Sequence, residues 1–512
     1  MSRVRPSVLH VPHAGSRPSA PHGTHAVVIG AGIAGIAAAV SLCERGVRVA
    51  LLEREAYLGG RAGGFAQTLA TGEHVQMERG FHAFFRQYYN LRALLRRVDP
   101  KLRVLSPLPS FPVFGSGGTH QVFRDAGSFL PQLQVLKVAW RTPHLRMLDF
   151  ARIDKRRTLE MLRFDPEQTY RDFDGCSADQ YLSSLSFPDK ARRVLLDFFA
   201  HSFFNPEREL SAAELLMFLH CYFSGNPQGL VFDVASAPMS IALWRPFEAW
   251  FAEHGVTVAK ATPARRIRPR EGGGYVVEYE AGQLECDLLV LALDVSGLKQ
   301  LVATSPELDP RLRAQVSSLE VTRPFAVLRL WLDRPLAADR PAFAGTVGVG
   351  ELDRIALYDR FQDESAAWAQ RRRGSVVELH GYALRTDDPA AVRADLLAGL
   401  RALYPEAQSA CIHDERLLIH QDCPAFGPGS HALRPTPDTG LPDLALAGDF
   451  VRLSLPCALM ERAATSGVLA ANVLLSRLDV APEPIRSVPT HGLFAPIHAP
   501  RWTHALGTSH AH

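Results

Sequence analysis

The spacing of apolar and glycine residues near the N-terminus predicts a strand, a tight turn and a helix. The β-branched run at residues 27–29 stops at a glycine-rich turn, residues 30–35, and residues 36–42 are apolar and rich in alanine. A second apolar run, residues 47–52, ends on Glu53. This order is that of the first βαβ unit of a dinucleotide-binding sheet. The nearly apolar stretch at residues 26–42 is too short to cross a membrane.

The glycines of the turn suit the close approach of a pyrophosphate. Gly30 permits the turn, Gly32 removes a Cβ that would keep phosphates from the backbone, and Gly35 lets helix and strand pack closely. The helix N-terminus offers its unpaired N–H groups to the phosphates, and Glu53 can accept hydrogen bonds from ribose hydroxyls. By itself the pattern predicts an ADP-containing dinucleotide and leaves NAD possible; a glycine-rich turn in an unrelated α/β unit is the alternative. The predicted contacts here are Gly30, Ala31, Gly32, Ile33, Ala34, Gly35 and Glu53.

Paired glycines on both sides of an arginine follow this ribose-binding acid. Residues 54–64 read REAYLGGRAGG, a loop from which Arg61 can present a planar cation to phosphate oxygens. The segment resembles the FAD site of the amine oxidase and carotenoid desaturase superfamily, where this motif follows the Rossmann turn. The resemblance implies FAD as the cofactor. It adds Arg54, Gly59, Gly60 and Arg61 to the predicted cofactor contacts.

A late strand ends on a second carboxylate. The apolar residues 444–447 lead into Gly448 and Asp449, at the carboxyl edge of the sheet where ligands of α/β proteins bind. The resemblance implies that Asp449 binds the ribityl or phosphate part of the flavin, and that the next helix directs its positive end toward the isoalloxazine. It adds Gly448, Asp449 and Met460 to the cofactor contacts. Amine oxidases carry a glycine where this chain has Arg462, which leaves the contact at that position open.

The resemblance implies a mixed α/β fold, in which a Rossmann-like FAD-binding domain is assembled from separated pieces and a substrate-binding domain is interleaved with it. The buried apolar strand at residues 286–294 belongs to the cofactor domain, whereas residues 321–333 and 375–384 read as strands of the substrate domain and residues 388–404 as its surface helix. We expect a disordered N-terminal tail (1–24), a first FAD-binding segment (25–104), a helical substrate- or membrane-facing region (105–245), a second FAD-binding segment (246–305), a substrate-domain sheet (306–435), a third FAD-binding segment (436–479) and a disordered C-terminal tail (480–512).

Aromatic residues concentrate in two segments. Phe84, Tyr88, Leu91, Leu95 and Val98 recur at helical spacing, which predicts a buried helix face. In the second segment, Ser211 and Glu214 form a capping-box pattern that starts a helix near Ala212. The aromatic rings of this segment either belong to a helical core or together line a tunnel for a long polyene. They are Phe198, Phe199, Phe203, Phe204, Phe218, Tyr222 and Phe223.

The run GFHAFFRQYYNLR, residues 80–92, narrows the resemblance. It is similar to the bacterial β-carotene desaturases/methylases, the isorenieratene synthases. That branch implies desaturation of a β-ionone ring with a methyl shift, which gives an aromatic carotenoid end group. A methyl shift passes through a cation that aromatic faces or a carboxylate can stabilise, so Glu78 and His82 are the candidate catalytic residues.

Composition removes several other classes of function. The charge is nearly balanced, with 56 basic and 53 acidic residues, which gives no indication of nucleic-acid binding. The seven cysteines are scattered without a CxxC pair and read as reduced thiols, and we see neither a nucleophile triad nor a metal-ligand cluster. With no signal-peptide run or spanning helix, we expect a cytoplasmic enzyme held peripherally at the inner face of the membrane by its apolar substrate.

Two alternatives stay open from the sequence. One is a phytoene- or squalene-type desaturase, or another flavoenzyme of the amine oxidase family. The other is a non-enzyme, similar to the prenyl-protein escort proteins that share the fold and bind lipid. An escort protein is expected to lack the full set of flavin contacts. The sequence gives no indication of the oligomeric state or the terminal electron acceptor.

Overall fold

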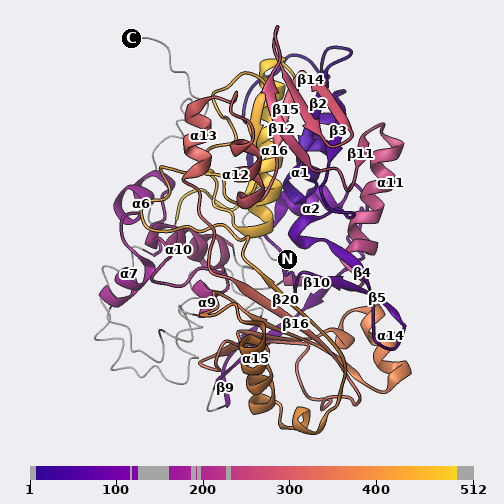
Figure 1. Cartoon of the computed structure of the whole chain (residues 1–512). Coiled ribbons are helices and arrows are strands. Elements are labelled where there is room, and N and C mark those ends of the chain that lie inside the picture. Colours follow the sequence, from indigo (N-terminus) through magenta and orange to yellow (C-terminus); the bar gives the residue numbers. More distant parts are fainter. Residues whose placement is uncertain are drawn as a thin grey trace.

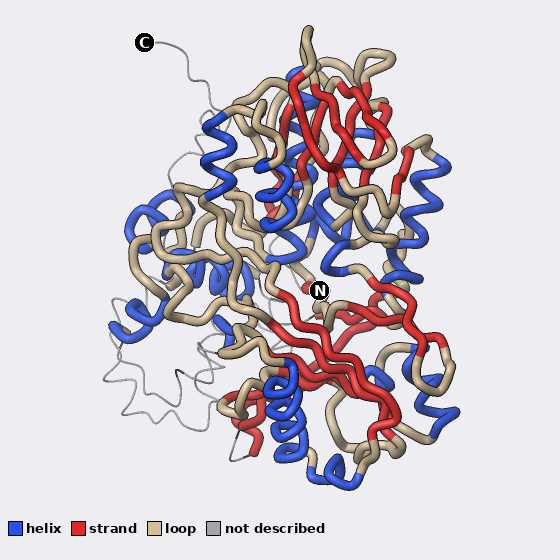
Figure 2. Tube along the Cα trace, viewed as in Figure 1, coloured by secondary structure: helices blue, strands red, loops and turns tan. Residues whose placement is uncertain are grey.

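The predicted glycine turn follows the central strand of a five-stranded parallel sheet. The computed structural model describes residues 7–115, 118–124, 161–185, 192, 198–226 and 232–492. Its parallel sheet has the strand order β11–β3–β2–β15–β21 (Figures 1 and 2). The strands are β2 (His25–Ile29), β3 (Arg48–Leu52), β11 (Thr257–Ala259), β15 (Leu288–Leu291) and β21 (Leu444–Leu446). Strands from three separated parts of the chain therefore meet in one sheet; the predicted domain boundaries themselves stay predictions.

Alternating side chains of this sheet enter two apolar cores, as the period of two in a strand requires. Val28 and Leu51 pack with helices α1 (Ile33–Cys43) and α16 (Leu459–Arg477), and Val27 and Ile29 pack on the opposite face. Helices α12 (Val295–Ala303) and α13 (Pro310–Ser317) cover that second face, together with the antiparallel strands β12 (Ala264–Pro269), β13 (Tyr275–Tyr279) and β14 (Gly282–Cys286). Burial on both faces is typical of a parallel sheet and explains its continuous apolar runs.

A second sheet of seven strands lies on the other side of the molecule (Figure 1), in the order β20–β16–β19–β18–β17–β8–β9. Its strands are β8 (Ser110–Gly115), β9 (Gly118–Arg124), β16 (Phe325–Leu332), β17 (Phe343–Val347), β18 (Arg354–Leu357), β19 (Ser375–Gly381) and β20 (Ile412–His420). Helix α15 (Pro389–Leu403) packs on one face, whereas the other face contacts helix α14 (Asp363–Arg372) and points toward the five-stranded sheet. Both strands and the surface helix predicted for this region are therefore present, with shorter bounds.

The helical region expected at residues 105–245 contains strands at both ends, and this expectation is wrong there. Strand β7 (Leu105–Leu108) pairs with β10 (Phe232–Ala235), and β8 pairs in parallel with β17, more than 200 residues later. Such pairing depends on distant partners, which a local helical period does not reveal. Between these strands lie helices α6 (Pro166–Phe173), α7 (Ala178–Ser184), α9 (Phe198–His201) and α10 (Ala212–Leu219). Residues 116–117, 125–160, 186–191, 193–197 and 227–231 of this region lie outside the described residues.

The helix predicted from Phe84 onward begins later than its spacing suggested. Phe84 and Phe85 form strand β6 (Phe84–Phe85), which pairs with β10, and helix α2 (Tyr89–Leu95) follows. The predicted apolar face is nevertheless buried, because the strand and the helix pack into the same part of the core. The remaining described elements are the strand pair β4 (Gly64–Thr68) and β5 (His74–Glu78), helix α11 (Arg245–Glu253), and the short turns Gly60–Ala62, His220–Ser224, Ser240–Trp244, Tyr358–Arg360 and Pro405–Ser409.

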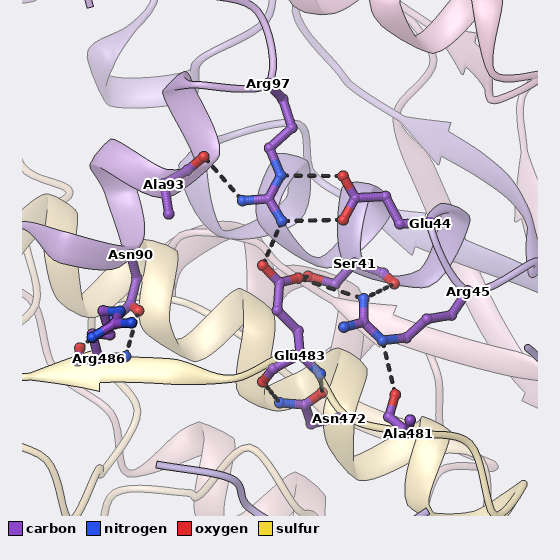
Figure 3. A network of polar contacts seen from close by, with 10 residues as sticks. All are labelled: Ser41, Glu44, Arg45, Asn90, Ala93, Arg97, Asn472, Ala481, Glu483 and Arg486. Atoms are coloured by element: carbon purple, nitrogen blue, oxygen red, sulfur yellow. Dashed lines mark hydrogen bonds and ion pairs between the residues drawn. The ribbon is translucent and has the colours of Figure 1, made fainter. Parts of the chain in front are cut away.

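The described parts of both termini are ordered, so the expectation of two disordered tails is wrong for them. Strands β1 (Val8–His10) and β22 (Ile485–Ser487) pair antiparallel, and Ile485 is fully buried. Figure 3 shows the polar contacts that hold the C-terminal segment: Glu483 accepts a hydrogen bond from Arg97 at 2.6 Å, and its backbone exchanges hydrogen bonds with Asn472 of α16. These partners are distant in sequence, which is why composition alone suggested disorder. Residues 1–6 and 493–512 lie outside the described residues.

Over the described ranges, none of the helices combines the length and the apolar character needed to cross a bilayer.

Candidate cofactor and substrate cavity

The glycine turn leaves open space where the sequence predicted a pyrophosphate. A Cβ built on Gly32 would meet nothing nearer than Cα of Gly60, 4.0 Å away, although Gly32 has an ordinary extended conformation with φ −72° and ψ −178°. A Cβ on Gly35 would lie only 1.8 Å from the carbonyl oxygen of Gly30. The two glycines therefore differ: Gly35 is required for close packing, whereas Gly32 has open space beside it, and its contact with a pyrophosphate stays a prediction.

Glu53 lies at the end of β3 and lines the cavity described below. Its carboxylate accepts hydrogen bonds from the backbone N–H groups of Ala31 at 2.7 Å and Glu55 at 2.9 Å. Burial raises the pKa of Glu53, while these hydrogen bonds oppose the shift. The contacts hold the carboxylate beside the turn, where ribose hydroxyls are expected.

The arginine of the second motif reaches the late carboxylate. Nη2 of Arg61 lies 2.6 Å from Oδ1 of Asp449, so two predicted cofactor residues from opposite ends of the chain form one ion pair. Burial disfavours the guanidinium charge, but Asp449 outweighs it and raises the pKa of Arg61 well above its ordinary value. Arg54, in contrast, lies nearer the surface and pairs with Asp294 at 3.1 Å, which in turn caps helix α12.

Two helix N-termini open onto the cavity that this ion pair also lines. Neither α1 nor α16 has a side-chain cap, and Ile33 and Ala34 of α1 and Leu459 and Met460 of α16 line the same cavity. Uncapped N–H groups and the helix dipole favour negative charge at such a point. The first turn of α16 thus lines the cavity, and its orientation toward a flavin stays a prediction.

The described residues enclose a cavity of about 580 Å³ that runs from these helix ends into the space above the seven-stranded sheet. Most predicted cofactor residues line it: Gly30, Gly32, Ile33, Ala34, Glu53, Arg54, Gly59, Gly60, Arg61, Gly448, Asp449 and Met460. Ala31 and Gly35 do not. Ala31 supports Glu53 through its N–H group, and Gly35 is covered by the turn itself, so both act behind the site.

The far end of the cavity is walled by aromatic rings. Of the rings that the sequence singled out, Phe199, Phe203, Phe204, Tyr222 and Phe223 line the cavity, whereas Phe218 stacks behind Phe203 with ring centroids 3.7 Å apart. The side chain of Phe198 lies outside what the structure describes. Rings from distant segments complete the wall, including Phe81 stacked on Phe343 with centroids 4.4 Å apart. Five of these rings therefore line the cavity, whereas Phe218 belongs to the core behind it.

The two candidate catalytic residues occupy different positions. His82 lines the cavity, and its Nδ1 lies 2.8 Å from the carbonyl oxygen of Gly80. A carbonyl accepts only, so Nδ1 carries the hydrogen and Nε2 keeps its lone pair. Burial lowers the pKa of His82 to about 4. The ring is therefore neutral near pH 7.

Glu78 does not line the cavity, and the predicted catalytic role for it needs correction. Its carboxylate accepts hydrogen bonds from the backbone N–H of Met239 at 2.7 Å and from the side chain of Gln362 at 3.1 Å. Arg329 lies 3.6 Å away as an ion-pair partner. These contacts bury Glu78 behind the wall, where it joins β5 to the second sheet.

Arg462, whose contact the sequence left open, turns away from the cavity. Its Nη2 donates to Glu214 at 2.9 Å, and Arg434 donates to the other carboxylate oxygen. Burial opposes ionisation of Glu214, but the two arginines lower its pKa to about 2. The expected capping box is thus only half formed: Ser211 caps Ala213 at 3.2 Å, while Glu214 binds the arginines. Helix α10 still begins at Ala212, as predicted.

The sequence reasoning missed a buried polar group on the cavity face of the second sheet. It consists of Arg329 on β16 with Glu378 and His380 on β19, and His380 lines the cavity. The sequence held a signal for this group, because charged and polar residues interrupt two strands that are otherwise almost wholly apolar. Polar residues two apart in such a strand point to the same face.

The arrangement fits FAD. Open space over Gly32, a carboxylate at the end of the second strand, two uncapped helix N-termini and an arginine between them match the ribose and phosphate groups of a dinucleotide. Glu53 would hold the adenosine ribose, Arg61 and the α1 N-terminus the phosphates, and Asp449 with the α16 N-terminus the flavin part.

Comparisons with known proteins agree with this geometry. The sequence profile of the family "Flavin containing amine oxidoreductase" matches residues 33–475. The chain is 47% identical to a carotenoid phi-ring synthase of Streptomyces griseus, over 91% of this chain and 90% of that protein, and 28% identical to one of Chlorobaculum tepidum, over 92% and 91%. The solved structure of cyclohexylamine oxidase from Brevibacterium oxydans superposes with a TM-score of 0.64 at 16% identity, covering 90% of this chain and 100% of that one. The predicted fold class is confirmed.

Proposed function

The chain belongs to the flavin-containing amine oxidoreductase family, and from this premise we propose that it desaturates the β-ring of a carotenoid and shifts a methyl group, giving an aromatic end group of the isorenieratene type. It is an FAD-dependent oxidoreductase. The proposal for its substrate is supported by two relatives named carotenoid phi-ring synthase. They align with this chain over 90% and 91% of their own length. The observation that carries it is the single cavity that joins the cofactor residues to an aromatic wall.

The walls of this cavity suit a long apolar substrate. Its substrate end is built mainly of phenylalanine and tyrosine rings that come from the seven-stranded sheet, from strands β6 and β10, and from the helical region. A polyene offers few polar groups, so burial against such rings supplies its affinity. A small polar amine would instead be held best by an anionic group at this end, and Glu378, beside the cavity-lining His380, is already paired with Arg329 and His380.

The chemistry divides between the cofactor and the chain. When bound, FAD supplies the acceptor for a hydride. The chain orients the ring beside it, excludes water, and surrounds the developing cation with aromatic faces, which attract positive charge. Phe81 and Phe343, stacked at 4.4 Å, are placed for this task beside His82.

The enzyme, we further propose, works in the cytoplasm and contacts the inner face of the membrane peripherally to collect its carotenoid. Sedimentation with carotenoid-loaded vesicles measures this contact. Protein that stays in the supernatant with loaded and empty vesicles alike would contradict it.

Expression in cells that accumulate β-carotene tests the proposed reaction. We expect a pigment whose mass and absorption spectrum are those of a carotenoid with an aromatic ring. Unchanged β-carotene, together with conversion of phytoene or lycopene in matching strains, would assign a linear desaturase instead. A purified protein that stays colourless with added FAD would favour a lipid-binding escort protein.

A further inference from the structure

A line of three buried polar side chains crosses two strands of the second sheet and ends at the cavity. Arg329 of β16 lies directly opposite Glu378 of β19, and His380 follows two residues later on the same face. Each of the three side chains is at most 1% exposed. Val327, which lies opposite His380, also lines the cavity, so this face of the sheet forms its floor.

The hydrogen bonds along this line define the state of the imidazole. Nε of Arg329 donates to Oε2 of Glu378 at 2.7 Å, and Oε1 of Glu378 lies 2.7 Å from Nε2 of His380. Burial opposes the charge of Glu378, but Arg329 and His380 lower its pKa to about 2, so it is ionised near neutral pH. An ionised carboxylate only accepts, and Nε2 therefore carries a hydrogen. In the neutral ring, the lone pair is then on Nδ1.

Nδ1 of His380 is buried and has no hydrogen-bond partner in the described protein. Buried polar atoms almost always have one, so the unpartnered lone pair of a histidine that lines the cavity calls for an explanation, and contact with a ligand is one. His82, the other histidine of the cavity, lacks a carboxylate partner and has its pKa lowered to about 4 by burial. The two histidines thus differ in geometry: a carboxylate accepts the N–H of His380, whereas a backbone carbonyl accepts that of His82.

We propose that His380 is the general base of the ring reaction, with Glu378 and Arg329 as positioning residues. The proposal rests on the proposed function. Converting a β-ring to an aromatic ring with a methyl shift removes two hydrides and two protons. Each hydride leaves to FAD, which an external electron acceptor reoxidises before the second transfer, and each departure leaves a cation on the ring. Nδ1 of His380 then takes the proton from the neighbouring carbon, and the C–H electron pair becomes the new C=C bond.

Variants of His380 separate this role from a structural one. The side-chain amide of His380→Gln can still donate to Glu378 but offers no basic lone pair. We expect it to bind FAD with unchanged affinity and to lose ring conversion by about 10²- to 10⁴-fold, the range of general base catalysis. His74→Gln, an exposed histidine on β5, is the matched control and retains full conversion. Imidazole added to His380→Ala should restore part of the activity.

Variants of Glu378 test the positioning residues. Glu378→Gln replaces the carboxylate that accepts the N–H of His380 with an amide of similar size, so the imidazole is held less firmly. We expect kcat for ring conversion to fall, while KM and the affinity for FAD stay unchanged.

The outcomes distinguish the two proposals. Wild-type enzyme that leaves β-carotene unchanged refutes the proposed function. Wild-type conversion matched within about threefold by His380→Gln overturns the role of His380 alone. If His380→Gln loses both FAD binding and ring conversion, and imidazole does not rescue His380→Ala, then His380 has a structural role. This result also overturns the inference.

Discussion

A methyl group added at Gly32 should remove cofactor binding without harming the fold. The Cβ of Gly32→Ala would have no neighbour nearer than 4.0 Å, and the backbone angles at this position suit any residue. The substitution therefore costs the apoprotein little. It places a methyl group where the phosphates must approach the turn.

The expected magnitude follows from the contacts that the methyl group disrupts. If two hydrogen bonds from backbone N–H groups to phosphate are lost at ~1.5 kcal/mol each, FAD binding weakens by ~3 kcal/mol, or roughly 150-fold in Kd. Gly35→Ala should behave differently, because its Cβ would lie 1.8 Å from the carbonyl oxygen of Gly30. We expect that variant to lower the unfolding temperature. Gly175→Ala is the control, since its Cβ would have no neighbour within 4 Å.

Titration of the apoprotein with FAD, followed by flavin absorbance, measures Kd, and thermal unfolding without FAD measures the fold. The reasoning is refuted if Gly32→Ala binds FAD within about threefold of the wild type. It is refuted equally if the unfolding temperature of apo Gly32→Ala falls as far as that of Gly35→Ala.

Three further predictions concern the cavity wall and the buried charges. Phe81→Ala removes one ring of the stacked pair with Phe343, and we expect slower ring conversion in a pigment assay at unchanged flavin content. Arg462→Met leaves Glu214 with one arginine. Chemical denaturation should show that the free energy of unfolding falls by roughly 3 kcal/mol, toward the lower end of the range for a broken buried pair. An unchanged denaturation midpoint would contradict this. The pKa of Glu214 is lowered from 4.5 to about 2 on folding, so its contribution to the free energy of unfolding is complete above pH 4.5 and is lost as the pH falls toward 2. Urea titrations across this range should show that acid reduces the stability of Glu214→Gln less than that of the wild type.

Most of the residues at the cofactor end of the cavity were predictable from local sequence patterns. The turn at residues 30–35, Glu53 and the strand that ends at Asp449 each depend on a local order of strand, turn and helix, and such order is written in nearby residues. The resemblance of residues 54–64 then pointed to FAD. These features were predictable because the chemistry of a dinucleotide requires particular residue types at short, fixed spacings.

Only the tertiary structure decided how distant segments meet. The ion pair of Arg61 with Asp449, the pairing of β8 with β17, and the ordering of both terminal segments by β1 and β22 all join residues hundreds of positions apart. Arg329 and Glu378 are 49 positions apart, and they too meet only because adjacent strands place them opposite each other. Strand register is set by packing across the whole sheet, and local periodicity carries no record of it. That is why Glu78 looked catalytic from the sequence, while His380 became a candidate only when its strand was seen to form the cavity floor.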